Sequence, residues 1–320
     1  MLSMRRSLPV LGLAAATVLA VTGCATAAAG DEASDGGRLS VVASTDVYGQ
    51  IAAEVGGDLV EVTSIVGNES QDPHSFEPSA RDQLVVSKAD LIVENGGGYD
   101  AFVDALIESS GSEAHVVTAV EYSDDWPGDA GHDHDDQTHD DHDHVEGLNE
   151  HVWYDPHTIA HVASAIADEL GALSPGDAET FTANAAAFRA EVEGLEASLA
   201  EIGAEHGGEK AFVTEPVPAY LIAAAGIANA TPEAFSEAVE EGQDVAPATL
   251  LEALHLIEGG DVSVVITNAQ TGGAETQAIV DEAEGLGIPV IAFSETLPAG
   301  ETYISWMRAN IEALNEALQA

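Results

Sequence analysis

Histidines in two proline-closed segments are the residues of this sequence best suited to hold a metal ion. His74 lies in the segment QDPHSFEPS (71–79), between two prolines, and His151 lies in NEHVWYDP (149–156), which ends in a proline. Proline restricts the backbone, so each imidazole is presented from a rigid turn. Imidazole nitrogen is a good ligand for zinc, copper and nickel. For either histidine alone, capping or packing of a turn is the alternative interpretation.

A third group of histidines lies between these two segments. Between Asp124 and Glu146 the chain has ten acidic residues and five histidines, namely His132, His134, His139, His142 and His144. Such a stretch has too little apolar surface to offset the entropy of ordering, so we predict a disordered loop over residues 124–147. His-rich tracts are typical of metal binding, and we interpret this loop as a low-affinity metal collector. An insertion that only keeps the chain soluble is the alternative.

The two proline-closed motifs, at this separation, resemble those of the cluster A-I metal-binding substrate-binding proteins of ATP-binding-cassette importers for zinc and manganese. The resemblance implies two small βα lobes joined by a rigid helix, one metal ion in the cleft between them, and delivery to a membrane permease. It also implies four metal ligands: His74, His151, Glu215 in FVTEPVPAY (212–220), and Glu295 in IAFSET (291–296). Aspartate is usual at the fourth position, so the longer Glu295 leaves its direct contact with the ion open.

The identity of the metal depends on two features that point in different directions. Glu215 stands where zinc receptors of this family usually have histidine and manganese receptors have glutamate. The His-rich loop favours zinc, because manganese prefers oxygen ligands. We predict Zn2+, with Mn2+ or iron as the alternative. Glu150 and Asp155 are expected to orient His151 by hydrogen bonds, as ligating histidines commonly require.

Functions of other classes remain open at the level of sequence. An exported zinc hydrolase could use the same ligands with Glu77 as its base, but neither an HExxH nor a GxSxG motif accompanies it. An adhesin or an extracellular metal buffer is a further alternative. His157 and His161, four residues apart on a predicted helix, are a minor candidate for a second metal pair. We predict a binding protein and no enzyme.

The N-terminal residues predict export and attachment to a membrane. Residues 1–23 combine Arg5 and Arg6, an apolar run and small residues, as a secretory signal does, and they precede Cys24, the only cysteine of the chain. This junction resembles a lipobox, which implies lipid attachment at Cys24 and an extracytoplasmic, membrane-anchored protein. A plain signal peptide with an incidental cysteine is the alternative. Residues 24–37 then form a flexible tether.

The charge of the chain limits its partners. Eight basic residues oppose 57 acidic ones, which gives a formal net charge of −49. Such a field repels nucleic acid and attracts cations. We therefore expect no nucleic-acid partner, and we expect the protein to act as a monomer.

The elements that position these residues alternate between strand and helix. Short β-branched runs at 39–44, 59–66, 91–94 and 115–119, with helices between them, predict a parallel sheet in an N-terminal lobe over 38–123 and 148–174. Apolar residues spaced three and four apart predict a long bridging helix over 175–207. Runs at 211–214, 262–267 and 289–293 predict a C-terminal lobe over 208–320. The fold class is therefore α/β, with two βα lobes of mostly parallel sheets joined by a long α-helix.

Overall fold

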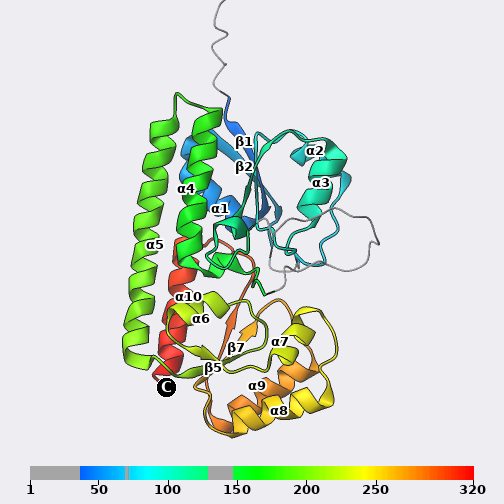
Figure 1. Cartoon of the computed structure of the whole chain (residues 1–320), viewed down its shortest axis with the longest axis vertical. Helices are drawn as coiled ribbons and strands as arrows, with labels where there is room; N and C mark the ends of the chain where they lie inside the picture. Colours follow the sequence, from blue (N-terminus) through cyan, green and yellow to red (C-terminus); the bar gives the residue numbers. More distant parts are fainter. Residues whose placement is uncertain (1–36, 69–70, 72, 129–146) are drawn as a thin grey trace, which may run out of the picture. The chain divides into compact units, whose positions relative to one another are not determined.

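The computed structural model of the chain describes residues 37–68, 71, 73–128 and 147–320, and residues 38–320 form one compact unit (Figure 1). The N-terminal lobe contains β1 (Leu39–Thr45), α1 (Asp46–Gly56), η1 (Gly57–Leu59), β2 (Val60–Val66), α2 (Ala80–Val86), β3 (Leu91–Glu94), α3 (Phe102–Ser110), β4 (His115–Thr118) and η2 (Ala119–Tyr122). Its four strands pair in parallel in the order β2-β1-β3-β4. The predicted strands are all present.

The second half of the chain repeats this arrangement. After η3 (Val152–Tyr154) come the helices α4 (Pro156–Leu173) and α5 (Ala178–His206), then β5 (Lys210–Val213), α6 (Ala219–Ala224), β6 (Ala228–Asn229), α7 (Glu233–Glu240), α8 (Pro247–Glu258), β7 (Val264–Asn268), α9 (Ala274–Leu286), β8 (Val290–Phe293) and α10 (Tyr303–Leu318). The parallel order is β6-β5-β7-β8. The predicted α/β class with two βα lobes is confirmed.

Alternation along the strands divides the apolar residues between two faces of each sheet. Val41 and Ala43 of β1 belong to a large inner core, whereas Val42 between them packs with α2 and α3 on the outer face. In β5, Phe212 likewise packs on the outer face, with residues of α7, α8 and α9, while Ala211 and Val213 join the inner core. Successive side chains of a strand point to opposite faces, so each sheet is covered by helices on both sides.

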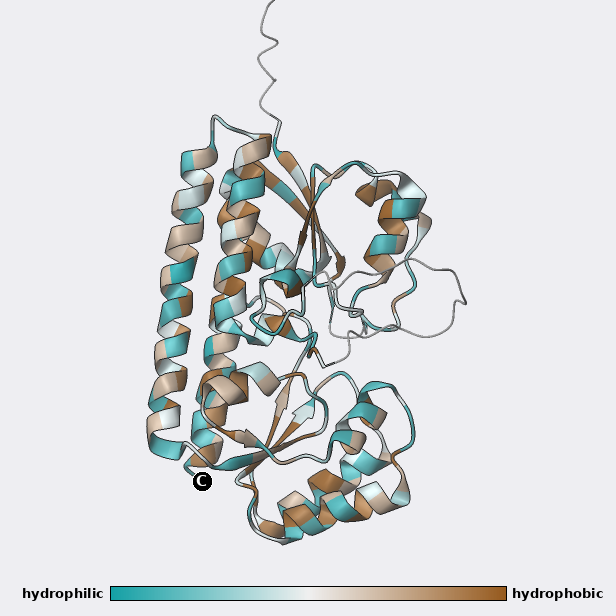
Figure 2. Cartoon of the chain, viewed as in Figure 1, coloured by the Kyte–Doolittle hydropathy of each residue, from teal (hydrophilic) through white to brown (hydrophobic). Residues whose placement is uncertain are grey.

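The bridging helix α5 runs along this inner core. Its buried residues follow the predicted spacing of three and four and are Phe181, Ala185, Phe188, Val192, Leu195, Leu199 and Ile202. It packs against α4 and α1 and also against α6 and α10, so it contacts elements of both lobes. Figure 2 shows α4 and α5 alternating between hydrophilic and hydrophobic residues along their length, as expected for helices with one buried face.

Local chemistry explains where individual elements begin. Ser79 caps α2, because its hydroxyl accepts from the Asp82 amide and the Asp82 carboxylate accepts from the Ser79 amide. Helix α3 begins only at Phe102, because Gly96, Gly97 and Gly98 all have positive φ and form a turn before it. Within the described residues no helix is both long and apolar enough to cross a bilayer.

Candidate metal centre

The candidate metal ligands lie in loops that follow the carboxyl ends of the parallel strands. His74 belongs to the loop after β2, Glu215 follows β5, and Glu295 follows β8. His151 immediately precedes η3 and helix α4. In open α/β sheets, ligands bind beyond the carboxyl ends of the strands, so the topology accounts for the positions of His74, Glu215 and Glu295, whereas His151 comes from the segment before η3.

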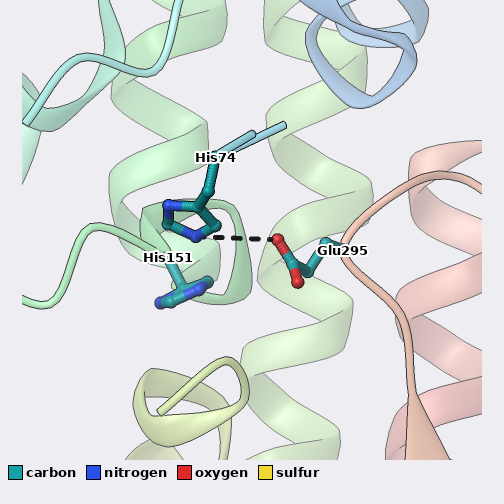
Figure 3. A group of neighbouring side chains, drawn as sticks. All are labelled: His74, His151 and Glu295. Carbon is teal, nitrogen blue, oxygen red and sulfur yellow. Dashed lines mark ion pairs between the residues drawn. The ribbon is translucent and has the colours of Figure 1, made fainter. Parts of the chain in front are cut away.

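Three of the four predicted ligands meet closely. His74, His151 and Glu295 each offer one ligand atom, and these atoms lie within 4.8 Å of one another (Figure 3). The His74 Nε2 atom is 4.0 Å from Glu295 Oε2, and the two imidazole rings have centroids 6.0 Å apart. His151 and Glu295 are almost fully buried, whereas the His74 side chain is 20% exposed. Two nitrogens and one oxygen at this spacing suit zinc, manganese or iron(II).

Glu215 approaches this group through an amide that sequence reasoning missed. The Asn268 Nδ2 group donates to Glu215 Oε2 at 3.0 Å and to Glu295 Oε1 at 2.7 Å. Thr271 donates to the other oxygen of Glu215. Asn268 is the last residue of β7, and one amide nitrogen carries two hydrogens, so it can hold two buried carboxylates side by side. Glu215 is thus linked to Glu295, one of the three closely spaced ligands, through the side-chain amide of Asn268.

The orientation of His151 depends on Asn149. The His151 Nδ1 atom lies 2.7 Å from Asn149 Oδ1, an acceptor, so Nδ1 carries the proton and Nε2 keeps a lone pair for a metal. Asp155, expected to orient His151, lies at the start of α4. It caps α4 by accepting from the amides of His157 and Thr158. Asn149 lies within the motif quoted above, but the prediction gave the orienting role to the neighbouring carboxylates of Glu150 and Asp155.

Aromatic rings surround the two histidines. Tyr99 contacts His74 edge-on with centroids 4.8 Å apart, and Trp153 contacts His151 at 5.1 Å. The Tyr99 hydroxyl donates to Glu295 Oε2 at 3.2 Å, and burial, with the Glu295 carboxylate nearby, raises the pKa of Tyr99 well above its ordinary value. Tyr99 and Trp153 are themselves buried, so they lower the local dielectric constant beside the two histidines and strengthen electrostatic interactions there.

Two further carboxylates lie beside His74. Glu150, predicted to orient His151, places Oε1 3.5 Å from His74 Nδ1. Glu240, at the end of α7, was missed, because no motif around it distinguishes it from the many other acids of the chain. His74, Glu150 and Glu240 also offer three ligand atoms within 4.8 Å of one another. Burial, followed by the carboxylates of Glu150, Glu215 and Glu295, raises the pKa of Glu240 to about 8.

Other candidates lie apart from this site or outside the described residues. His157 and His161 contact each other with ring centroids 4.9 Å apart, and the exposed His157 lies 3.7 Å from Glu196. Among the described residues, neither histidine joins a group of three ligands. The predicted collector histidines His132, His134, His139, His142 and His144, and the predicted lipid attachment site Cys24, lie outside the described residues.

Comparison with protein families shows to which family the chain belongs. Residues 41–317 match the family described as zinc-uptake complex component A, periplasmic. The chain belongs to this family. The resemblance to the cluster A-I substrate-binding proteins, first seen in the two proline-closed motifs, is therefore confirmed over nearly the whole chain.

Named relatives of this family member bind different metals. The zinc-binding lipoprotein AdcA of Streptococcus pneumoniae serotype 4 is 26% identical over 295 residues, which cover 88% of this chain and 56% of AdcA. The chain thus spans little more than half the length of that relative. The manganese ABC transporter substrate-binding lipoprotein PsaA of Streptococcus anginosus is 25% identical, with 94% of this chain and 96% of PsaA covered.

Solved structures of the same architecture agree with the fold. A mutant structure of the laminin-binding adhesin Lmb from Streptococcus agalactiae has a TM-score of 0.70 at 26% identity, covering 88% of this chain and 99% of Lmb. A crystal structure of ZnuA has a TM-score of 0.68 at 20% identity, covering 88% of this chain and 100% of that one. The second likeness supports the two-lobed fold alone.

Proposed function

We propose that this protein is an extracytoplasmic receptor that captures one zinc ion and delivers it to the membrane permease of an ATP-binding-cassette importer. The ion is held by His74, His151, Glu215 and Glu295, which we call the cleft site. The observation that carries this proposal is the convergence of ligand atoms from His74, His151 and Glu295 within 4.8 Å, although these residues are far apart in the sequence. Such convergence at strand ends is typical of a binding site.

The charges of the cleft site match a divalent ion. Two neutral imidazoles and two carboxylates together carry the charge that cancels a dication. Without an ion, the two carboxylates repel each other, and the hydrogen bonds from Asn268 compensate only part of that repulsion. An ion therefore relieves a buried electrostatic cost, which favours tight binding.

The remaining parts of the proposal concern residues outside the described ones. Cleavage before Cys24 and lipid attachment there would anchor the receptor beside its permease, with residues 24–37 as a tether. The five loop histidines would collect zinc weakly and raise its concentration near His151, which follows the loop closely in the chain. The relatives AdcA and PsaA are both named as lipoproteins, which supports the anchor.

Manganese is the second candidate, because the site is rich in oxygen donors. Glu150, Glu215 and Glu295 are buried around two histidines, and the less buried Glu240 lies beside them. Carboxylate oxygen suits manganese better than it suits softer ions. The collector histidines favour zinc, so we retain zinc as the proposal. A hydrolase has less support, since Glu77, the base that it would need, is exposed to solvent.

Native mass spectrometry after competitive loading with zinc and manganese tests the proposal. We expect one tightly held zinc per wild-type chain, lost in His74→Ala and in His151→Ala. Deletion of residues 129–144 should remove weakly bound zinc and leave the tight ion in place. Glu215→His should shift the preference further towards zinc. A wild-type chain that prefers manganese, or a tight ion that disappears with the loop, would contradict the proposal.

A further inference from the structure

We propose that His74, Glu150 and Glu240 form a second, outer metal site, through which the ion passes on its way into the cleft site. This inference rests on the proposed function as a metal receptor. It adds a role for Glu240, which belongs to helix α7 and to none of the sequence motifs. It also gives Glu150 a role towards His74.

The geometry of the outer site is close to that of a coordinated ion. One ligand atom from each of the three residues lies within 4.8 Å of the other two. Ligand atoms on a tetrahedral zinc are about 3.4 Å apart, given bonds of about 2.1 Å, so shifts of roughly 1 Å would complete the site. The ligands come from three segments, namely the loop after β2, the residues before η3, and the end of α7.

His74 is shared by the two sites, and its two ring nitrogens face different carboxylates. Nδ1 lies 3.5 Å from Glu150 Oε1, whereas Nε2 lies 4.0 Å from Glu295 Oε2. A neutral imidazole has only one nitrogen with a free lone pair, so it can bind one ion at a time. The outer and cleft sites therefore cannot both be filled through His74. This exclusion fits one ion that occupies the two sites in sequence.

A cavity leads to the outer site. It has a volume of about 720 Å³, and its lining includes His74 and Glu240 together with the acids Glu241, Asp244 and Glu275. Of the cleft-site ligands, His74 is the one that lines this cavity among the described residues. His151 and Glu295 are buried behind it, so an ion that enters by the cavity meets His74 and Glu240 first. The extra acids concentrate cations there.

Metal-binding kinetics of the full-length chain test this path. Zinc association is measured by stopped flow and zinc dissociation by chelator competition, for wild type, Glu240→Gln and Glu241→Gln. Glu241→Gln is the matched control, because it removes one negative charge from the same cavity wall. We expect Glu240→Gln to slow zinc association and zinc dissociation by a similar factor of about ten, with little change in Kd. The reason is that the ion passes through the outer site both when it enters and when it leaves the cleft site. Glu241→Gln should change association only, by less than about threefold, as loss of steering does.

Two outcomes would overturn the outer site. Equal kinetics for Glu240→Gln and Glu241→Gln would mean that Glu240 only attracts cations by its charge and does not bind the ion. A large rise in Kd for Glu240→Gln, driven by faster dissociation, would make it a ligand of the cleft site instead. If the proposed receptor function itself were wrong, the wild-type chain would bind no zinc tightly, which distinguishes that failure from the failure of the outer site.

A structural measurement gives an independent result. Crystals of His151→Ala, which lacks one cleft ligand, are soaked in a zinc salt, and the zinc is located by anomalous scattering. We expect a peak within bonding distance of His74, Glu150 and Glu240. A peak beside Glu295 and away from Glu240, or no peak at these residues, would refute the proposal.

Discussion

Glu94, at the end of β3, predicts how the stability of the protein depends on pH. Burial, followed by the carboxylates of Asp100 and Asp104, raises its pKa from 4.5 to about 8, although the Thr118 hydroxyl donates to it at 2.8 Å. In the unfolded chain the same carboxyl ionises near its ordinary value. Between these two pKa values, the folded chain keeps a proton that the unfolded chain has released.

The sign and size of the effect follow from proton linkage. The folded state binds more protons between pH 4.5 and 8, so the contribution of Glu94 to the free energy of unfolding is complete below pH 4.5 and falls as pH rises to 8. Each pKa unit corresponds to about 1.36 kcal/mol, so a shift of 3.5 units (8 minus 4.5) sets an upper limit of about 5 kcal/mol. Glu94→Gln keeps the shape and the acceptor for Thr118 but cannot ionise.

Urea unfolding of the metal-free protein at pH 5, 6.5 and 8 measures this contribution. We expect the stability of Glu94→Gln relative to wild type to rise with pH, by about 2–5 kcal/mol between pH 5 and pH 8. Glu113→Gln, an exposed position of the same lobe, is the control and should show no such trend. A difference between Glu94→Gln and wild type that stays constant with pH would refute the reasoning.

Three further predictions concern the site and its supports. Asn268→Ala removes both hydrogen bonds that position Glu215 and Glu295, and it should weaken zinc binding by about 10–100-fold in competition titrations. Asn229→Ala, an exposed asparagine of the same lobe, should leave zinc affinity unchanged, and equal affinities for the two variants would contradict this role. Ser79→Ala removes the cap of α2, and urea unfolding should show a loss of about 1 kcal/mol; an unchanged midpoint would exclude a role for this cap. Gly96→Ala should cost about 2 kcal/mol or more in the same assay, because φ is 77° and the added Cβ would lie 2.4 Å from a Thr118 methyl; a neutral result would mean that the turn relaxes easily.

The sequence predicts the sheets well because most of their strands are short runs rich in β-branched and apolar residues. The runs in β1 and β3 are buried on both faces, which is why they read as continuous rather than alternating. Strand β6 was missed because it has only two residues, both exposed, and helices α6 to α9 were not located individually. The boundaries of the signal segment, the tether and the His-rich loop remain predictions.

The candidate site could be predicted only in part. The family motifs point to His74, His151, Glu215 and Glu295, and the structure brings three of these together and places the fourth next to them through Asn268. Nothing in the sequence pattern points to Asn268, because its role depends on two carboxylates that approach it from other segments. Glu240 was missed for the same reason. Such contacts arise from tertiary packing, which local spacing does not encode.

The inner core has a consequence for how the protein unfolds. It is continuous from Val41 in the first sheet, through Phe188 in α5, to Val264 in the second sheet. Either lobe separated from the other would expose this apolar surface to water, so neither has an independent melting transition. Heating should therefore denature residues 38–320 in a single cooperative step, and a captured ion raises the melting temperature of every part of that unit together.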